Sequence, residues 1–153
     1  MILEPATAAD LDAIVEIERH SFPQPWPRAT FAAELTRPNA YLDVARAPGL
    51  LGYCNSWIVP DPHGSAGEVH ILALATHPDH RRAGIGGALL GHALDRGRAQ
   101  RCTIATLEVR RGNLPAIAMY ERAGFRTVHV RARYYQDNGE DALVMISALS
   151  PSG

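Results

Sequence analysis

The sequence has few of the features that mark secreted or membrane-spanning proteins. It holds only two cysteines, Cys54 and Cys102, each isolated in an apolar segment. We interpret them as two reduced thiols in the core rather than as a disulfide. No apolar stretch approaches the ~18 residues that cross a bilayer, and the start lacks the basic and then apolar pattern of a secretory signal. The sequence therefore predicts a cytoplasmic protein without a membrane partner.

An excess of charge of one sign is also lacking. The 15 basic and 16 acidic residues give a formal net charge of −1, and they form no polybasic tract, so direct nucleic-acid binding is not expected. The chain has 153 residues, of which 46% are hydrophobic. That length can bury a sizeable core without metal or disulfides, and we predict a single domain over residues 1–153.

The periodicity of apolar residues and the turn signals predict the order of the elements. Thr7 and Asp10, three residues apart, are typical of a capped helix start, Pro27 suits the first turn of a second helix, and Gly124 suits a helix end. The predicted strands are 1–6, 41–46, 50–59, 68–76, 102–110, 125–135 and 141–149, and the predicted helices are 7–19, 27–35, 84–97 and 113–124. Two strand–helix–strand units in the second half indicate an α/β fold with a partly parallel sheet and helices on both faces.

The segment "HRRAGIGGALL" at residues 80–90 places glycines at a helix start. Gly84, Gly86 and Gly87 free the backbone to turn, so that several N–H groups point outward. These groups and the helix dipole favour an anion, and a pyrophosphate is the natural occupant. Arg81 and Arg82 add positive charge.

Three phosphate-binding patterns compete for this segment. No lysine follows the glycines, which argues against a P-loop, and Leu89 stands where a dinucleotide fingerprint needs its third glycine. The third pattern, R-x-x-G-x-G, is met by Arg81, Gly84 and Gly86. From this hexapeptide alone, an ordinary tight turn with solvated arginines stays an alternative interpretation.

This third pattern resembles the pyrophosphate loop of the GCN5-related N-acetyltransferase (GNAT) superfamily, which holds coenzyme A. The segment "LEVRRGNLPAIAMYERAGF" (107–125) is similar to the ribosomal-protein-alanine N-acetyltransferase (RimI-like) branch, with its E-V-R-x-x-N and A-I-x-x-Y-E-x-x-G-F stretches. "SFPQPW", "ATHPDHRRAGIGGALL" and "RARYYQDNGEDALVM" match as well, in the same order. Departures are Gly112 in place of a polar residue, Pro115 in place of a small one, and Arg81 in place of glutamine. Pro115 is harmless if Asn113 caps the helix.

The resemblance implies a GNAT-type domain whose mixed, mostly antiparallel sheet has a central parallel pair, and acetyl-CoA as co-substrate. It also implies that a backbone N–H of residues 74–76 polarises the acetyl carbonyl. The implied coenzyme-binding residues are Leu74, Ala75, Thr76, Arg81, Arg82, Ala83, Gly84, Ile85, Gly86, Gly87 and Asn113, the last of which could instead only cap its helix.

The resemblance assigns the general base to Glu108 and the general acid to Tyr120. Acetyl transfer needs a neutral amine, and an N-terminal amine, with a pKa near 8, is an easier target than a lysine with a pKa near 10.4. A tyrosine hydroxyl is protonated at neutral pH and can donate its proton to the departing sulfur. From the residues alone, Glu68 and His70 are rival bases, and Glu108 could be a solvated strand-end carboxylate.

Tyr134, Tyr135 and Phe22 are the implied substrate-binding residues, although the two tyrosines could be ordinary strand-end aromatics. Trp26 is interpreted as core or groove wall. His77 and His80 have no third ligand near in sequence, and no metal is expected. The predicted function is N-terminal acetylation of a protein, with an alanine-starting ribosomal protein as type substrate. An enzyme acetylating a small-molecule amine, and a non-catalytic acetyl-CoA-binding module, stay as alternatives.

Overall fold

The structure is a computed structural model that describes residues 1–64 and 66–150. The chain divides into two compact units, the first made of residues 1–57 and 72–93 and the second of residues 58–71 and of the chain from residue 94 on. The strand order is β1-β2-β3-β4-β5-β7-β6. This mixed α/β sheet confirms the predicted fold class. Strand β4 and helix α3 each pass from one unit into the other.

The first unit follows the predicted order closely. Its elements are β1 (Ile2–Pro5), η1 (Ala8–Asp10), α1 (Leu11–Ser21), α2 (Arg28–Glu34), β2 (Ala40–Arg46), most of β3 (Leu50–Val59), the end of β4 (Glu68–Thr76), η2 (Pro78–His80) and the start of α3 (Ile85–Ala99). The N–H of Thr7 donates to the Asp10 carboxylate at 2.9 Å, which supports the first helical turn. β2 pairs antiparallel with both β1 and β3.

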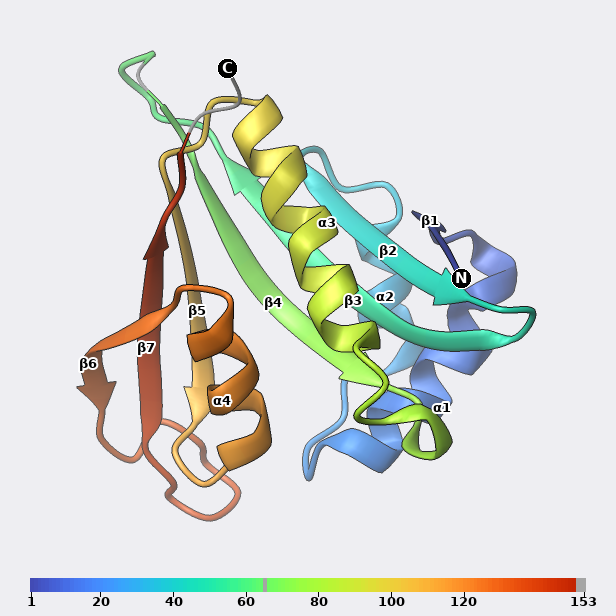
Figure 1. The fold of residues 1–153 in the computed structure, drawn as a ribbon. Helices are drawn as coiled ribbons and strands as arrows, with labels where there is room; N and C mark the ends of the chain where they lie inside the picture. The colour runs from blue at the N-terminus through green and yellow to red at the C-terminus, as the bar shows by residue number, and fades with distance from the viewer. Residues whose placement is uncertain (65, 151–153) are drawn as a thin grey trace. The chain divides into compact units, whose positions relative to one another are not determined.

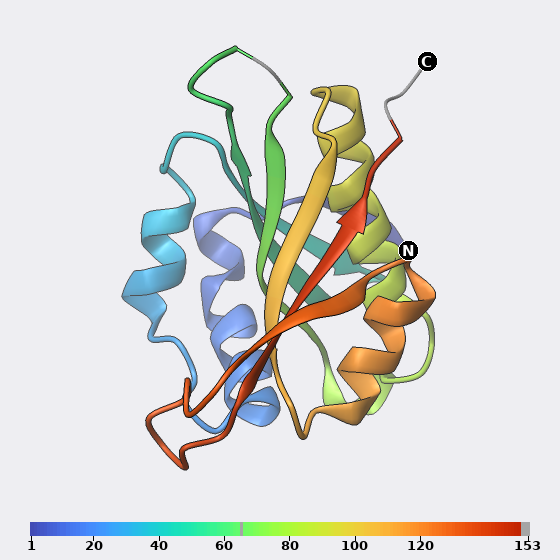
Figure 2. The ribbon, with the colours of Figure 1, turned by 90° about the vertical axis from the view of Figure 1, so that its left-hand side faces the viewer.

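The core of the first unit forms where α1 and α2 cover the strands. Helix α1 buries Leu11, Ile14 and Ile17 against Phe31 of α2 and Tyr53 of β3. Gly52, the residue before Tyr53 on β3, faces α3 instead. A Cβ built on Gly52 would lie 3.2 Å from Leu89 and 3.3 Å from Ile85, both of which belong to α3. Adjacent strand residues point to opposite faces. Helices therefore cover both faces of this part of the sheet, as predicted and as Figures 1 and 2 show.

The second unit contains the parallel pair of strands. Residues 68–71 of β4 pair parallel with β5 (Ile104–Arg110), and β7 (Ala142–Ala148) pairs antiparallel with both β5 and β6 (Arg126–Arg131). Helix α4 (Leu114–Arg122) begins after Asn113, whose side chain accepts from the N–H of Ala116 at 3.4 Å. Pro115 lies in the first turn and Gly124, at φ +98°, follows the helix end, as expected.

The prediction of a strand over residues 125–135 is wrong in its second half. β6 ends at Arg131, and Arg133 takes the left-handed backbone at φ +53°. Tyr134 and Tyr135 therefore lie in the loop between β6 and β7 rather than at a strand end. β6 itself is exposed throughout and carries arginines at both ends, which suits an edge strand.

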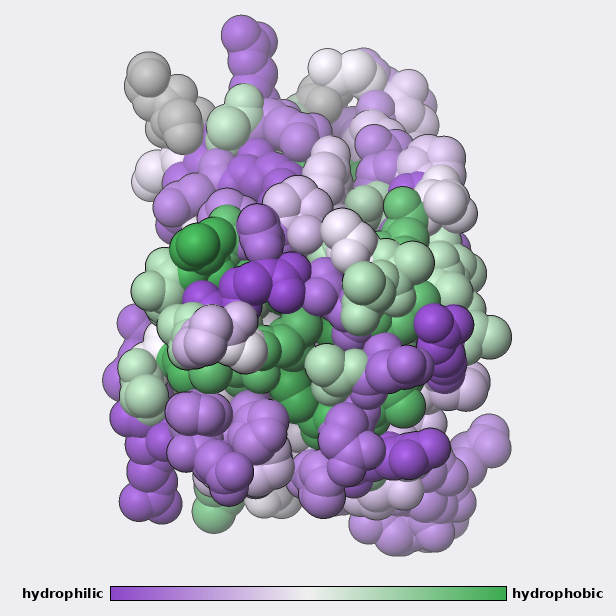
Figure 3. All heavy atoms as spheres, turned by 90° about the vertical axis from the view of Figure 1, so that its right-hand side faces the viewer, coloured by the Kyte–Doolittle hydropathy of each residue, from purple (hydrophilic) through white to green (hydrophobic). Residues whose placement is uncertain are grey.

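Cys54 and Cys102 are both buried, and no disulfide joins them, as predicted. Within residues 1–64 and 66–150, no helix combines the length and the apolar character that crossing a membrane requires. On the face drawn in Figure 3, a band of hydrophobic side chains is bordered above and below by hydrophilic ones.

Candidate active site

The glycine turn of the first unit has part of the backbone that the sequence predicts, because Gly84 is left-handed whereas Gly86 and Gly87 lie within α3. Arg82 and Gly84 take the left-handed conformation, at φ +67° and +80°. The N–H of Ala88 donates to the Gly84 carbonyl at 3.0 Å and opens α3. The earlier N–H groups of a helix start have no intrahelical partner. A Cβ on Gly84 or Gly87 would meet no heavy atom within 4 Å, so the space beside these glycines is open.

Arg81 braces this turn against the rest of the first unit. Its Nη2 donates to the His20 carbonyl and to Ser21 Oγ, both at 3.2 Å, and its Nε donates to the Thr76 carbonyl at 3.3 Å. Arg82, like Arg81, is exposed. An open helix start with outward N–H groups and exposed guanidinium groups fits a pyrophosphate.

The other candidate residues of the first unit lie on β4 and after α1. Leu74, Ala75 and Thr76 end β4, and the next residue, His77, donates its N–H to the Leu51 carbonyl at 2.7 Å, which fixes this strand end. Phe22 is partly buried and packs against the hydrophobic core. Its role in substrate binding stays a prediction.

In the second unit, the candidate base Glu108 is paired with a rival candidate. His70 Nε2 lies 3.0 Å from Glu108 Oε2, and both side chains are about three-quarters buried. The hydrogen bond to His70 lowers the pKa of Glu108, and the positive charge of Arg131 lowers it further, while burial opposes both. Glu108 is therefore ionised at neutral pH. Burial raises the pKa of the Cys102 thiol, and the negative charge of Glu68, the other rival, raises it further.

Tyr120 and Asn113 both belong to α4 or its start. Tyr120 is buried, and its ring meets Phe125 edge-on with centroids 5.8 Å apart. The Asn113 side chain caps α4, as its sequence position allows. These contacts hold α4 in place in the second unit.

The loop over residues 132–141 carries the two tyrosines and is held by charged groups. Arg110 donates to both oxygens of Asp137, at 3.0 and 3.1 Å, and to Glu140 at 3.3 Å. The second Glu140 oxygen accepts the N–H of Gly112 at 2.7 Å. A Cβ on Gly112 would lie 2.7 Å from that same oxygen, so a side chain at this position would have to displace the end of the Glu140 side chain. Arg110 lowers the pKa of Asp137, and the Gly112 N–H lowers that of Glu140.

Tyr134 and Tyr135 have different surroundings. The Arg110 guanidinium lies 3.9 Å from the centre of the Tyr135 ring, and burial raises the pKa of Tyr135 to about 12. Tyr134 is 44% exposed and meets Tyr135 edge-on at 5.1 Å between centroids. Tyr135 is therefore part of the scaffold of the loop, and Tyr134 is the tyrosine that the loop presents.

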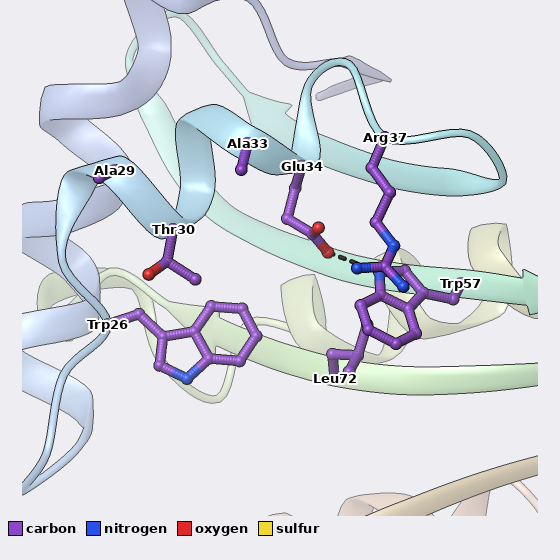
Figure 4. A pocket seen from close by; sticks show the side chains of 8 residues that line it. All are labelled: Trp26, Ala29, Thr30, Ala33, Glu34, Arg37, Trp57 and Leu72. Atoms are coloured by element: carbon purple, nitrogen blue, oxygen red, sulfur yellow. Dashed lines mark hydrogen bonds between the residues drawn. The ribbon is translucent and has the colours of Figure 1, made fainter.

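The first unit also has a pocket of about 530 Å³ beside α2, which no sequence pattern predicts (Figure 4). Its lining residues are Trp26, Ala29, Thr30, Ala33, Glu34, Arg37, Trp57 and Leu72. Trp26 is a groove wall, as interpreted. Glu34 and Trp57 gave no signal in sequence, because their contact joins residues 23 positions apart.

His77 and His80 have ring centroids 5.4 Å apart. Within the residues that the structure describes, no group of three or more histidines, cysteines or carboxylates could hold a metal ion.

Comparisons with known proteins agree on one family. The sequence model of the Acetyltransferase (GNAT) family matches residues 11–125. The chain is 36% identical over 142 residues to the N-alpha-acetyltransferase RimI of Mycobacterium tuberculosis, covering 91% of this chain and 87% of that protein. It is 32% identical over 143 residues to the ribosomal protein bS18-alanine N-acetyltransferase of Escherichia coli, covering 92% and 93%. The crystal structure of the ribosomal-protein-S18-alanine N-acetyltransferase from Escherichia coli matches with a TM-score of 0.85 and 30% identity, covering 99% of this chain and 96% of that chain.

Proposed function

Because the chain belongs to the acetyltransferase (GNAT) family, we propose that it transfers the acetyl group of acetyl-CoA to the N-terminal amine of a protein. The observation that carries this proposal is the likeness to two relatives named for N-terminal acetylation, which extends over 91% and 92% of the chain. We infer that an alanine-starting ribosomal protein, of the kind named for the Escherichia coli relative, is the type substrate.

Acetyl-CoA supplies a thioester-activated acetyl group when it is bound. The residues that would hold its pyrophosphate are the glycines and arginines of the turn over residues 81–87, and their open backbone suits a group with several anionic oxygens. A backbone N–H of residues 74–76, at the end of β4, would polarise the acetyl carbonyl. Asn113 would contribute through the same side chain that caps α4.

Glu108 acts as the general base in this proposal. Its lowered pKa keeps it ionised at neutral pH, so it can accept a proton from the substrate ammonium, directly or through water. His70 is a positioning residue, because its hydrogen bond fixes the orientation of the carboxylate. Tyr120 supplies the proton that the departing sulfur takes up. An α-amine with a pKa near 8 needs only a weak base of this kind.

Tyr134 and Phe22 are the proposed contacts of the substrate N-terminus, with Tyr135 supporting Tyr134. An exposed aromatic side chain on a loop held by ion pairs can contact a peptide without a large loss of conformational entropy. The small-amine and non-catalytic alternatives have no comparable structural support.

The test is a panel of N-terminal peptides incubated with acetyl-CoA and assayed by mass spectrometry. We expect α-acetylation of alanine-starting peptides, whereas no acetylation of any peptide would contradict the proposal. Glu108→Gln should lower the turnover number by about 10²–10⁴-fold. Part of the activity should return as the pH rises above about 8, where solvent deprotonates the amine. Glu68→Gln is the matched control, and a larger loss for it would move the base to β4.

A further inference from the structure

The pocket beside α2 contains a largely buried carboxylate, one of whose oxygens accepts no hydrogen bond from the described residues. Glu34 is only 6% exposed. Its Oε1 accepts from Asn55 Nδ2 at 2.7 Å and from Trp57 Nε1 at 2.5 Å. Within the described part of the chain, Glu34 Oε2 has no hydrogen-bond partner, although the side chain lines the pocket. Among the described residues, only Asn55 Oδ1 is a fully buried polar side-chain atom without a partner, so Glu34 Oε2 is reached from the pocket, where an occupant can donate a hydrogen bond to it.

The walls of this pocket are aromatic and are fixed in place. The Glu18 carboxylate accepts the backbone N–H of Trp26 at 2.8 Å, and the Trp26 ring packs against Phe31 at 5.3 Å between centroids. Figure 4 shows Trp26 and Trp57 on neighbouring sides of the pocket, with Glu34 reaching from α2 toward Trp57. Indole rings in such an arrangement attract cations.

Arg37 shows that one of these rings already accepts a guanidinium. Its Cζ lies 3.7 Å from the centre of the Trp57 ring. No ion pair between Arg37 and Glu34 occurs among the residues described, so Arg37 stacks on the indole without neutralising the carboxylate. The positive charge of Arg37 therefore leaves Glu34 Oε2 able to accept a hydrogen bond from a ligand.

We propose that this pocket binds a basic side chain, arginine or lysine, of the acceptor polypeptide. This inference rests on the proposed function, because the basic side chain would belong to the polypeptide that is acetylated. The ammonium or guanidinium donates to Glu34 Oε2 and lies against the indoles, while the methylene groups contact apolar lining residues such as Ala33 and Leu72. A volume of about 530 Å³ exceeds that of a lone guanidinium and accommodates a side chain together with adjoining backbone.

The binding test uses the intrinsic fluorescence of the protein. The chain has only two tryptophans, and both line this pocket, so their emission reports on it directly. The probes are alanine-starting peptides whose N-terminus is already acetylated, with one arginine moved along an otherwise neutral sequence. Twin peptides carry citrulline, the neutral isostere, instead of arginine. We expect saturable binding of an arginine peptide and about tenfold to hundredfold weaker binding of its citrulline twin.

Glu34→Gln separates a cation site from a structural role. The glutamine oxygen can still accept from Asn55 and Trp57, whereas the charge and the free acceptor are lost. We expect the difference between arginine and citrulline peptides to disappear in this variant at an unchanged melting temperature. Arg37→Gln is the matched control, and it should tighten binding of the arginine peptide because it removes a like charge. Equal binding of the twin peptides by the native protein, or an unchanged preference in Glu34→Gln, would overturn the proposal.

The same peptides with a free N-terminus give the kinetic readout. The ratio of KM for citrulline and arginine twins should fall toward one in Glu34→Gln. If no peptide is acetylated but arginine-dependent quenching needs Glu34, the proposed function fails and the cation site stands. If agmatine, a free guanidinium compound, binds as tightly as the best peptide, the pocket serves small cations, and the polypeptide occupant is refuted.

Discussion

The turn over residues 77–87 of the first unit and the loop over residues 132–141 of the second both use left-handed backbone but are held differently. The turn is shaped by Arg82 and Gly84 at positive φ, and open space surrounds the glycines. The loop has Arg133 and Gly139 at positive φ, and charged hydrogen bonds fill the space around it. The turn leaves backbone donors for a ligand, whereas the loop uses its own donors internally.

This difference indicates where each region should be sensitive. A side chain added to the turn meets no protein atom, so it should change ligand binding more than folding. Removing the Arg110 side chain, which holds the loop from β5, leaves the carboxylates of Asp137 and Glu140 without that partner, so it should change the conformation of the loop itself. Coenzyme affinity should therefore depend on the first region and acceptor affinity on the second.

Gly87→Glu carries the largest expected effect of this kind. The new side chain has room, but its negative charge lies beside the proposed pyrophosphate site. We expect the KM for acetyl-CoA to rise by about tenfold to hundredfold, the range for loss of one charged contact. Gly91→Glu, one turn further along α3 and also in open space, is the matched control for helix propensity and added charge. Steady-state kinetics measure the KM for acetyl-CoA in both variants. Equal KM values would show that the coenzyme does not bind at this turn.

Arg110→Gln should have a smaller effect, and it should weaken binding of the acceptor peptide rather than of acetyl-CoA. Its guanidinium is 13% exposed and holds Asp137, Glu140 and the Tyr135 ring. We expect the KM for the acceptor peptide to rise by about tenfold, the KM for acetyl-CoA to stay the same, and the melting temperature to fall. The matched control is Arg111→Gln, because Arg111 is 63% exposed and such surface pairs contribute about 0–1 kcal/mol. A rise in the KM for acetyl-CoA as large as that for the peptide would contradict the division between the two regions.

Local patterns were enough to predict most of the elements. The strand over residues 68–76 follows from apolar alternation and lies where expected. The glycine at position 124 predicts a helix end there, and α4 ends two residues before it. The left-handed Gly84 was predictable because glycine readily takes that conformation, whereas Arg82, which is left-handed as well, gave no such signal. The parallel pairing of β4 and β5 followed from the strand–helix–strand order.

Contacts between distant residues were not predictable from local patterns. Tyr134 and Tyr135 suit a strand by residue type, but Arg110, 27 residues before Asp137, helps to hold this segment as a loop. His70 and Glu108, 38 residues apart, were ranked as rival bases, and the structure makes them hydrogen-bond partners. The pocket depends on Glu34, Asn55 and Trp57, whose separations of 21 and 23 residues carry no periodic signal.

The smallest expected effect concerns the order of the tyrosine loop in solution. Burial raises the pKa of Tyr135 to about 12, against about 10 for an unfolded chain. The folded state therefore favours the neutral phenol, and the stability that this contributes is complete below about pH 10 and is lost as the pH rises to about 12. Because the ring is only half buried, we expect the loss to be about 1 kcal/mol or less.

The measurement is the ultraviolet absorbance of tyrosinate during an alkaline titration of the native protein and of Tyr135→Phe. The difference between the two curves isolates one of the five tyrosines, and its midpoint should lie at about 12. Tyr135→Phe should also lose less stability than the native protein between about pH 10 and 12, because it has no phenol to ionise at this position. Tyr134→Phe serves as the control for loss of a phenol from the same loop. Because burial is what raises this pKa and the charge of Arg110 lowers it, a difference midpoint near 10 for Tyr135 would mean that the ring is not buried in solution. The contrast between an open turn and a self-contained loop would then be lost.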